Sequence, residues 1–165
     1  MGVGAVVYND LYQDPRRNIA LDWDRMLSLQ GNSAPYIQYM HARCRSILRR
    51  AAEEGLLPAD ADLASVGGLA IDAAQLTHPA EVALIKQLAR LPGAVREAGA
   101  RYAPFVVAEW CHEAARLTSA FYRDCPVIAA PSAELRLARL CLVAATAQAL
   151  RNGLALLGIT APERM

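Results

Sequence analysis

The chain has 165 residues, a length that suits one domain, and its composition excludes several classes of protein. Hydrophobic residues make up 55% of the sequence and charged residues 20%, which is enough apolar material for a core and argues against long disorder. No apolar run approaches the roughly 20 residues needed to span a bilayer, and the apolar N-terminus lacks the basic flank of a signal peptide. We therefore expect a cytoplasmic protein with no membrane partner.

The net charge of +1 does not by itself indicate a nucleic-acid-binding protein. Lys86 is the only lysine among 17 basic residues, so arginine carries the rest of the positive charge. Arginine suits contacts with phosphates and stacking on bases, but a GC-rich genome would also supply it, and composition leaves both explanations open. The four cysteines are scattered without a Cys-x-x-Cys pair, so we expect buried, reduced thiols and no metal site.

The first 32 residues are predicted to be irregular. They contain a charged turn around Pro15 and a short mixed run through Trp23 and Met26, and no hydrophobic periodicity is sustained. The segment resembles the middle of a longer protein more than a fold of its own.

From residue 33 onward, helical spacing of apolar residues predicts an all-α bundle of about five helices. Asn32 or Ser33 can cap the first helix, which has Pro35 in its first turn and ends near Gly55. A looser connector with a Gly-Gly pair follows over 58–78. Further helices are expected from 79 to Pro92, over 94–102, from 104 to about 124 and over 132–157.

No set of residues assembles into a catalytic site, so the chain is not expected to be an enzyme on its own. Gly2-x-Gly4 lacks the third glycine of a dinucleotide-binding motif, and no Gly-x-x-x-x-Gly-Lys phosphate loop occurs. His41 and Cys44 lie three residues apart on one predicted helix, but ordinary helix packing explains that spacing better than a nucleophile with its base. No cofactor is predicted for this chain.

Five motifs in a fixed order resemble those of a known family. They are GNSAPYIQYMHARCRSI at 31–47, HPAE at 78–81, FYRDCPV at 121–127, ELRLARL at 134–140 and LRNGLALLGITAPERM at 150–165. Together they resemble the C-terminal part of arginyl-tRNA synthetase, a class I aminoacyl-tRNA synthetase, over nearly the whole chain. The resemblance implies that residues 33–165 form the all-α anticodon-binding domain and that residues 1–32 are the tail of the catalytic domain or a connector.

The resemblance also implies a function for the chain and its partners. The family's two ATP-handling signatures are absent, and the Lys-Met-Ser-like one cannot exist here because Gln87 follows the only lysine. The chain would therefore bind the anticodon stem and loop of an arginine-accepting tRNA without ligating arginine to it. ATP and Mg²⁺ would belong to the intact enzyme, whose catalytic domain would be the second partner. We expect a monomer that does not bind DNA.

One stripe of the first long helix is the main candidate surface for RNA. Tyr36, Tyr39 and Arg43 are spaced three and four residues apart, and Arg50 continues the stripe. Aromatic rings stack on unpaired bases, and guanidinium groups hold phosphates. From the residues alone, packing at the edge of the core and a solvated charged face are the simpler explanation. The resemblance favours RNA contact for Tyr39, Arg43 and Tyr36, with Gln38 as a candidate beside the stripe.

Three further candidates for tRNA binding lie elsewhere in the chain. Tyr122 ends the fourth predicted helix beside a loop, where its ring could stack on a base. Asn152 lies opposite the apolar stripe of the last helix, where its amide could read a base edge or bind a neighbouring backbone group. Met165 is expected on a tail that folds back near the anticodon site.

Two other functions remain open. One is a free-standing helical paralogue that binds tRNA or protein without ligase activity, although residues 1–32 argue against it. The other is a purely structural helical module whose arginines only keep it in solution. Arg139 is expected to have a role in packing rather than in RNA binding, and it could pair with Glu81 or Glu134.

Overall fold

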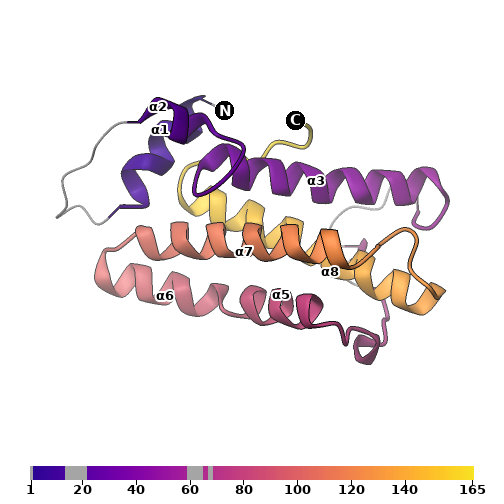
Figure 1. Ribbon diagram of the computed structural model, residues 1–165. Helices are drawn as coiled ribbons and strands as arrows, with labels where there is room; N and C mark the ends of the chain where they lie inside the picture. The colour runs from indigo at the N-terminus through magenta and orange to yellow at the C-terminus, as the bar shows by residue number, and fades with distance from the viewer. Residues whose placement is uncertain (1, 14–21, 59–64, 67–68) are drawn as a thin grey trace.

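The computed structural model describes residues 2–13, 22–58, 65–66 and 69–165, and the regular structure in these ranges is entirely helical (Figure 1). The long helices α3 (Ala34–Glu53), α7 (Phe105–Asp124) and α8 (Ala133–Leu156) pack against one another. The shorter α5 (Pro79–Ala89) and α6 (Leu91–Arg101) pack on the side of α7 away from α3. The predicted all-α fold and its five main helices are confirmed.

Helices α3 and α8 begin and end close to the predicted positions, and of the two candidate caps of α3 the structure selects Ser33. Ser33 caps α3 by accepting a hydrogen bond from the Tyr36 amide (3.3 Å), and Ser132 caps α8 in the same way. Gly55 follows α3 with φ +70°, and Gly158 follows α8 with φ +71°. Because this left-handed backbone carries little penalty for glycine, both helices stop at defined points.

The junction between α5 and α6 differs from expectation. Pro92 was predicted to stop a helix, but it lies in the first turn of α6, which begins at Leu91 directly after a break at Arg90. Proline lacks an amide hydrogen, and the first-turn amides of a helix have no intrahelical acceptor, so proline fits there without loss.

The core consists of two clusters that α3, α7 and α8 share. One lies around Leu84, Phe121 and Leu140, and the other around Ile37 and Leu150. Each of these side chains is almost fully buried. The three helices are therefore fixed relative to one another along most of their length, which makes them a rigid base for a surface site.

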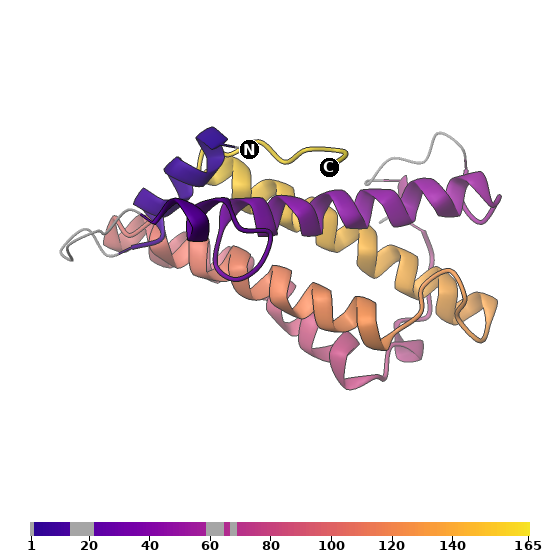
Figure 2. The same ribbon diagram turned by 45° about the horizontal axis from the view of Figure 1, so that its top comes forward.

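The described parts of the N-terminal segment, residues 2–13 and 22–32, are more helical than expected. Residues 1–32 were predicted to be irregular, but they contain α1 (Gly2–Leu11) and α2 (Trp23–Leu27), which lie at the N-terminal end of α3 in both ribbon views (Figures 1 and 2). Tyr8 anchors α1: its buried hydroxyl donates to Asn32 Oδ1 (2.6 Å) and lies 3.0 Å from the carbonyl oxygen of Ala108. Burial also raises the pKa of Tyr8 well above its ordinary value.

Two sequence expectations fall on residues that the structure does not describe. The charged turn around Pro15 and the Gly-Gly pair of the connector lie outside the described residues. Of the connector's described part, Ala73–Gln75 form the 3₁₀ helix η1. Within the described ranges, none of the helices combines the length and the apolar character that crossing a membrane requires.

Candidate nucleic-acid interface

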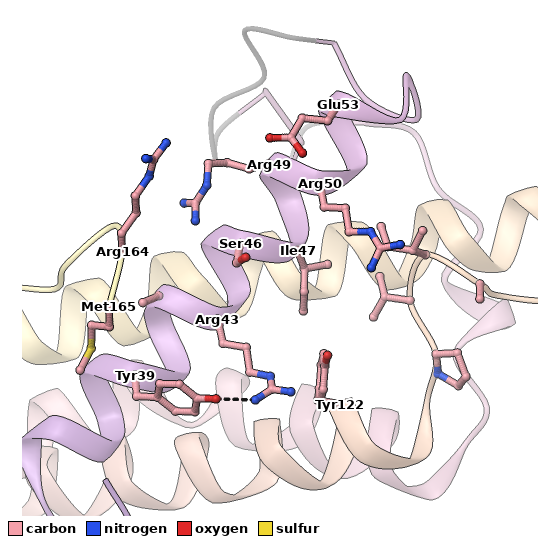
Figure 3. Close-up of a pocket in the computed structure, with 15 residues that line it drawn as sticks. Tyr39, Arg43, Ser46, Ile47, Arg49, Arg50, Glu53, Tyr122, Arg164 and Met165 are labelled. Carbon is pink, nitrogen blue, oxygen red and sulfur yellow. Dashed lines mark hydrogen bonds between the residues drawn. The ribbon is translucent and has the colours of Figure 1, made fainter.

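An open groove of about 910 Å³ runs over the outer surface of α3 (Figure 3). Its edges are the end of α7 with the loop over 126–129 on one side and the last residues of the chain on the other. The lining includes the aromatic and basic side chains Tyr39, Arg43, Arg49, Arg50, Tyr122 and Arg164. Among the described residues that line it, Glu53 is the only acidic one, so this part of the groove favours an anionic ligand.

Arg43 lies between two tyrosines at the centre of the groove. Its Nη1 donates to Tyr39 Oη (2.5 Å), and its Cζ lies 3.8 Å from the centre of the Tyr122 ring and 5.7 Å from that of Tyr39 (Figure 3). Each ring face attracts the guanidinium, and the hydroxyl orients it. The arrangement joins two ring faces and one positive charge in a space the size of a nucleotide or larger.

Tyr122 reaches the groove because α7 turns its two final aromatic residues in opposite directions. Phe121 is 1% exposed in the core, as predicted, whereas Tyr122 is 42% exposed beside the loop. The loop itself is held by Arg139, whose Nη1 donates to the Pro126 carbonyl oxygen (2.7 Å) and whose Nε donates to Glu81 Oε1 (2.6 Å). Of the two predicted partners of Arg139, the structure selects Glu81.

The tail over 158–165 folds back along α3, and two polar side chains of the helix bind its first part (Figure 2). Gln38 Nε2 donates to the Thr160 carbonyl oxygen (2.7 Å), and His41 Nδ1 lies 2.9 Å from the Pro162 carbonyl oxygen. Burial lowers the pKa of His41, so the ring is neutral near pH 7 and its Nδ1–H donates this bond. Gln38 therefore binds the tail.

Two arginines of α3 bind the next residue of the tail. Arg45 Nε donates to the Glu163 carboxylate (Oε2, 2.5 Å), and Arg49 Nη1 donates to the Glu163 carbonyl oxygen (2.9 Å). Arg164 and Met165 follow directly and line the groove.

The groove brings together four of the seven candidates for tRNA binding and leaves out three. Tyr39, Arg43, Tyr122 and Met165 line it. Tyr36 faces α7 instead: its hydroxyl lies 3.4 Å from the Ala115 carbonyl oxygen, and burial raises its pKa. Gln38 is only 5% exposed. Asn152 is exposed on α8, where it accepts a hydrogen bond from Gln148 (2.6 Å), away from the groove lining.

A second polar stripe of α3 was not predicted. Gln38, His41, Arg45 and Arg49 follow one another at spacings of three and four residues, and all four bind the tail. That periodic run of polar residues was a visible signal. It could not show which part of the chain would bind there.

The cysteines do not form a reactive centre. Burial raises the pKa of both Cys44 and Cys111 to about 12, so the thiols stay protonated at neutral pH and are poor nucleophiles. His41, the suggested base for Cys44, binds the tail instead. In the part of the chain that the structure describes, no three His, Cys, Asp or Glu side chains gather where they could hold a metal ion.

The bundle has the fold of a domain found in aminoacyl-tRNA synthetases. It matches part of the arginyl-tRNA synthetase of Thermus thermophilus with a TM-score of 0.83 and 33% identity, over 99% of this chain and 26% of that one. It matches the arginyl-tRNA synthetase of Plasmodium falciparum with a TM-score of 0.78 and 25% identity, over 99% of this chain and 27% of that one.

Sequence comparison gives the family. The model of the DALR anticodon binding domain matches residues 37–165, and the chain belongs to this family. The arginine–tRNA ligase of Chloroflexus aggregans is 67% identical over 165 residues, which are 100% of this chain and 27% of the relative. That of Thermococcus kodakarensis is 45% identical over all of this chain and 25% of the relative. The chain therefore spans about a quarter of the length of these curated relatives.

Proposed function

We propose that the groove over α3 binds the anticodon stem and loop of an arginine-accepting tRNA. The observation that carries this proposal is the position of Arg43 between the rings of Tyr39 and Tyr122, in a groove with an excess of positive charge. Unpaired bases of a loop would stack on the rings, and arginines would contact the phosphates. The family and the arginine–tRNA ligase relatives support tRNA as the partner.

The rest of the activity is proposed to lie outside this chain. Ligation of arginine to tRNA, with ATP and Mg²⁺, would require a catalytic domain to which residues 1–32 connect. Exposed apolar side chains on α1 and α2, among them Val3, Trp23 and Leu27, offer a surface for contact with such a domain. We propose a cytoplasmic monomer that by itself charges no tRNA and binds neither DNA nor membranes.

Binding of a fluorescent anticodon stem-loop, followed by anisotropy, tests the proposal. Tyr39→Ala is expected to weaken binding about 5- to 150-fold, which corresponds to the roughly 1–3 kcal/mol of one base–aromatic stack. Arg43→Ala is expected to weaken it and to reduce the slope of log K against log[salt] by about 0.7, the value for one phosphate contact in a single strand.

The matched control is Arg96→Ala, which removes the same charge from the exposed surface of α6, a helix that does not line the groove. It is expected to leave affinity nearly unchanged. If unrelated RNA binds as well as the arginine-accepting stem-loop, and the three variants behave alike, the chain is a structural module and the proposal fails. Binding to proteins but not to the stem-loop would support the alternative of a free-standing paralogue.

A further inference from the structure

The last residues of the chain depend on α3 for their position. Ile159 is buried at the end of α8, and from Thr160 onward the tail has no regular secondary structure. Its path is set by hydrogen bonds to side chains of α3, of which Glu163 receives two. Glu163 is the last residue of the tail that α3 binds, so the place of Arg164 and Met165 depends on these two bonds.

Glu163 is held by both its backbone and its side chain. Arg49 binds its carbonyl oxygen (2.9 Å), and Arg45 binds its carboxylate (2.5 Å). The carboxylate is 53% exposed and the Arg45 side chain 21% exposed. An ion pair this open to solvent adds little to the stability of a fold. What depends on the pair is the place of Arg164 and Met165, which form one edge of the groove opposite Tyr122 (Figure 3).

We propose that Arg45 and Glu163 are positioning residues for RNA binding. Arg45 does not line the groove, and through Glu163 it holds Arg164 and Met165 at the groove edge before RNA arrives. Side chains ordered in advance lose less conformational freedom on binding, so the pair raises affinity without touching the ligand. The inference rests on the proposed function, because it assumes that the groove binds the anticodon stem-loop.

Glu163→Gln separates positioning from simple electrostatics. The substitution removes a negative charge beside a groove for a polyanion, so electrostatics alone predicts tighter binding. Positioning predicts the opposite: affinity for the anticodon stem-loop should fall about 2- to 10-fold, the loss expected when one or two side chains must be immobilised on binding. Arg45→Gln should weaken binding to a similar extent, and combining the two substitutions should add little to either.

The matched control is Glu54→Gln, which also removes a carboxylate that accepts from an arginine of α3, at 2.7 Å from Arg50 Nε. Glu54 does not contact the tail, so this variant should bind as tightly as the unmodified chain or more tightly. The ¹⁵N–{¹H} NOE of the Arg164 and Met165 amides gives a readout without RNA, because it reports backbone motion on the picosecond to nanosecond scale. It should fall in Glu163→Gln and Arg45→Gln but not in the control, while the thermal unfolding midpoints stay within a few degrees.

The outcomes distinguish this inference from the function on which it rests. If the unmodified chain does not bind the stem-loop, the proposed function fails and the positioning role fails with it. If the unmodified chain binds and Glu163→Gln binds equally well or better, the function stands and the positioning role is overturned. Unchanged NOE values for Arg164 and Met165 in both Glu163→Gln and Arg45→Gln would also overturn it, because the tail would then hold its place without the pair.

Discussion

Replacing Glu81 with alanine tests how much a buried ion pair behind the loop edge of the groove stabilises the fold. Glu81 and Arg139 form a buried ion pair, with side chains that are 1% and 8% exposed. The second carboxylate oxygen of Glu81 accepts a hydrogen bond from the His78 amide (2.8 Å), and this bond caps α5. Arg139 also donates to the Pro126 carbonyl oxygen. The ion pair of Glu81 and Arg139 therefore connects α5, α8 and the loop over 126–129.

The expected loss of stability follows from what Glu81→Ala leaves behind. Arg139 keeps its charge in a buried place and retains Pro126 as its acceptor, and removing one partner of a buried pair typically costs about 3–5 kcal/mol. For a chain of this length each kcal/mol lowers the unfolding midpoint by about 2–4 °C, so the midpoint should fall by roughly 6–20 °C. Urea and thermal unfolding followed by circular dichroism measure both quantities.

A matched double substitution shows how much of the stability loss comes from the unpaired charge of Arg139 and how much from lost packing. Glu81→Leu with Arg139→Met removes both charges and keeps apolar volume, so it should be clearly more stable than Glu81→Ala. A loss below about 1 kcal/mol for Glu81→Ala, the range of exposed ion pairs, would refute the argument that this pair is buried and uncompensated.

Two further predictions concern the packing of α8 and the buried histidine of α3. Gly153→Ala should strain the packing by about 2–3 kcal/mol, because a Cβ there would lie 2.5 Å from Cys111 Sγ, and the net loss of stability in urea should be about 1–2 kcal/mol. This strain exceeds the roughly 1 kcal/mol gain in helix propensity, so equal or higher stability would contradict the close approach of α7 and α8. The pKa of His41 is lowered by burial from its ordinary 6.5, so the folded chain binds fewer protons than the unfolded chain just below that pH. The free energy of unfolding should therefore fall as the pH drops below 6.5, and His41→Gln should flatten that part of the profile; parallel profiles would contradict it.

Local sequence signals were sufficient to predict the long helices. The cap at Ser33, the apolar spacing of α3 and the glycine after it act within a few residues of one another. The fold of α1 could not be predicted in this way. Its anchor, Tyr8, donates to Asn32 and lies against the carbonyl oxygen of Ala108, 100 residues later, and a ten-residue helix is marginal without such tertiary contacts.

The candidate site shows the same division between local and distant causes. Tyr39 and Arg43 were predicted together because four residues separate them on one helix, and the structure places them in direct contact. Gln38 lies on the same helix, but its side chain points away from theirs and binds Thr160. The partner of Gln38 is 122 positions away in the sequence, so no pattern within α3 could distinguish binding the tail from binding RNA.

The two stripes of α3 explain why the groove needs the whole bundle. One stripe carries Tyr39 and Arg43 toward Tyr122 at the end of α7, and the other carries Arg45 and Arg49 toward the tail that follows α8. An isolated α3 would present the same side chains without either edge of the groove. Both edges exist only when α7 and α8 are packed on α3, so a ligand that contacts both edges binds only the folded chain. Such a ligand must raise the free energy of unfolding with the logarithm of its concentration once the site is mostly filled, because binding to the native state alone shifts the folding equilibrium toward it.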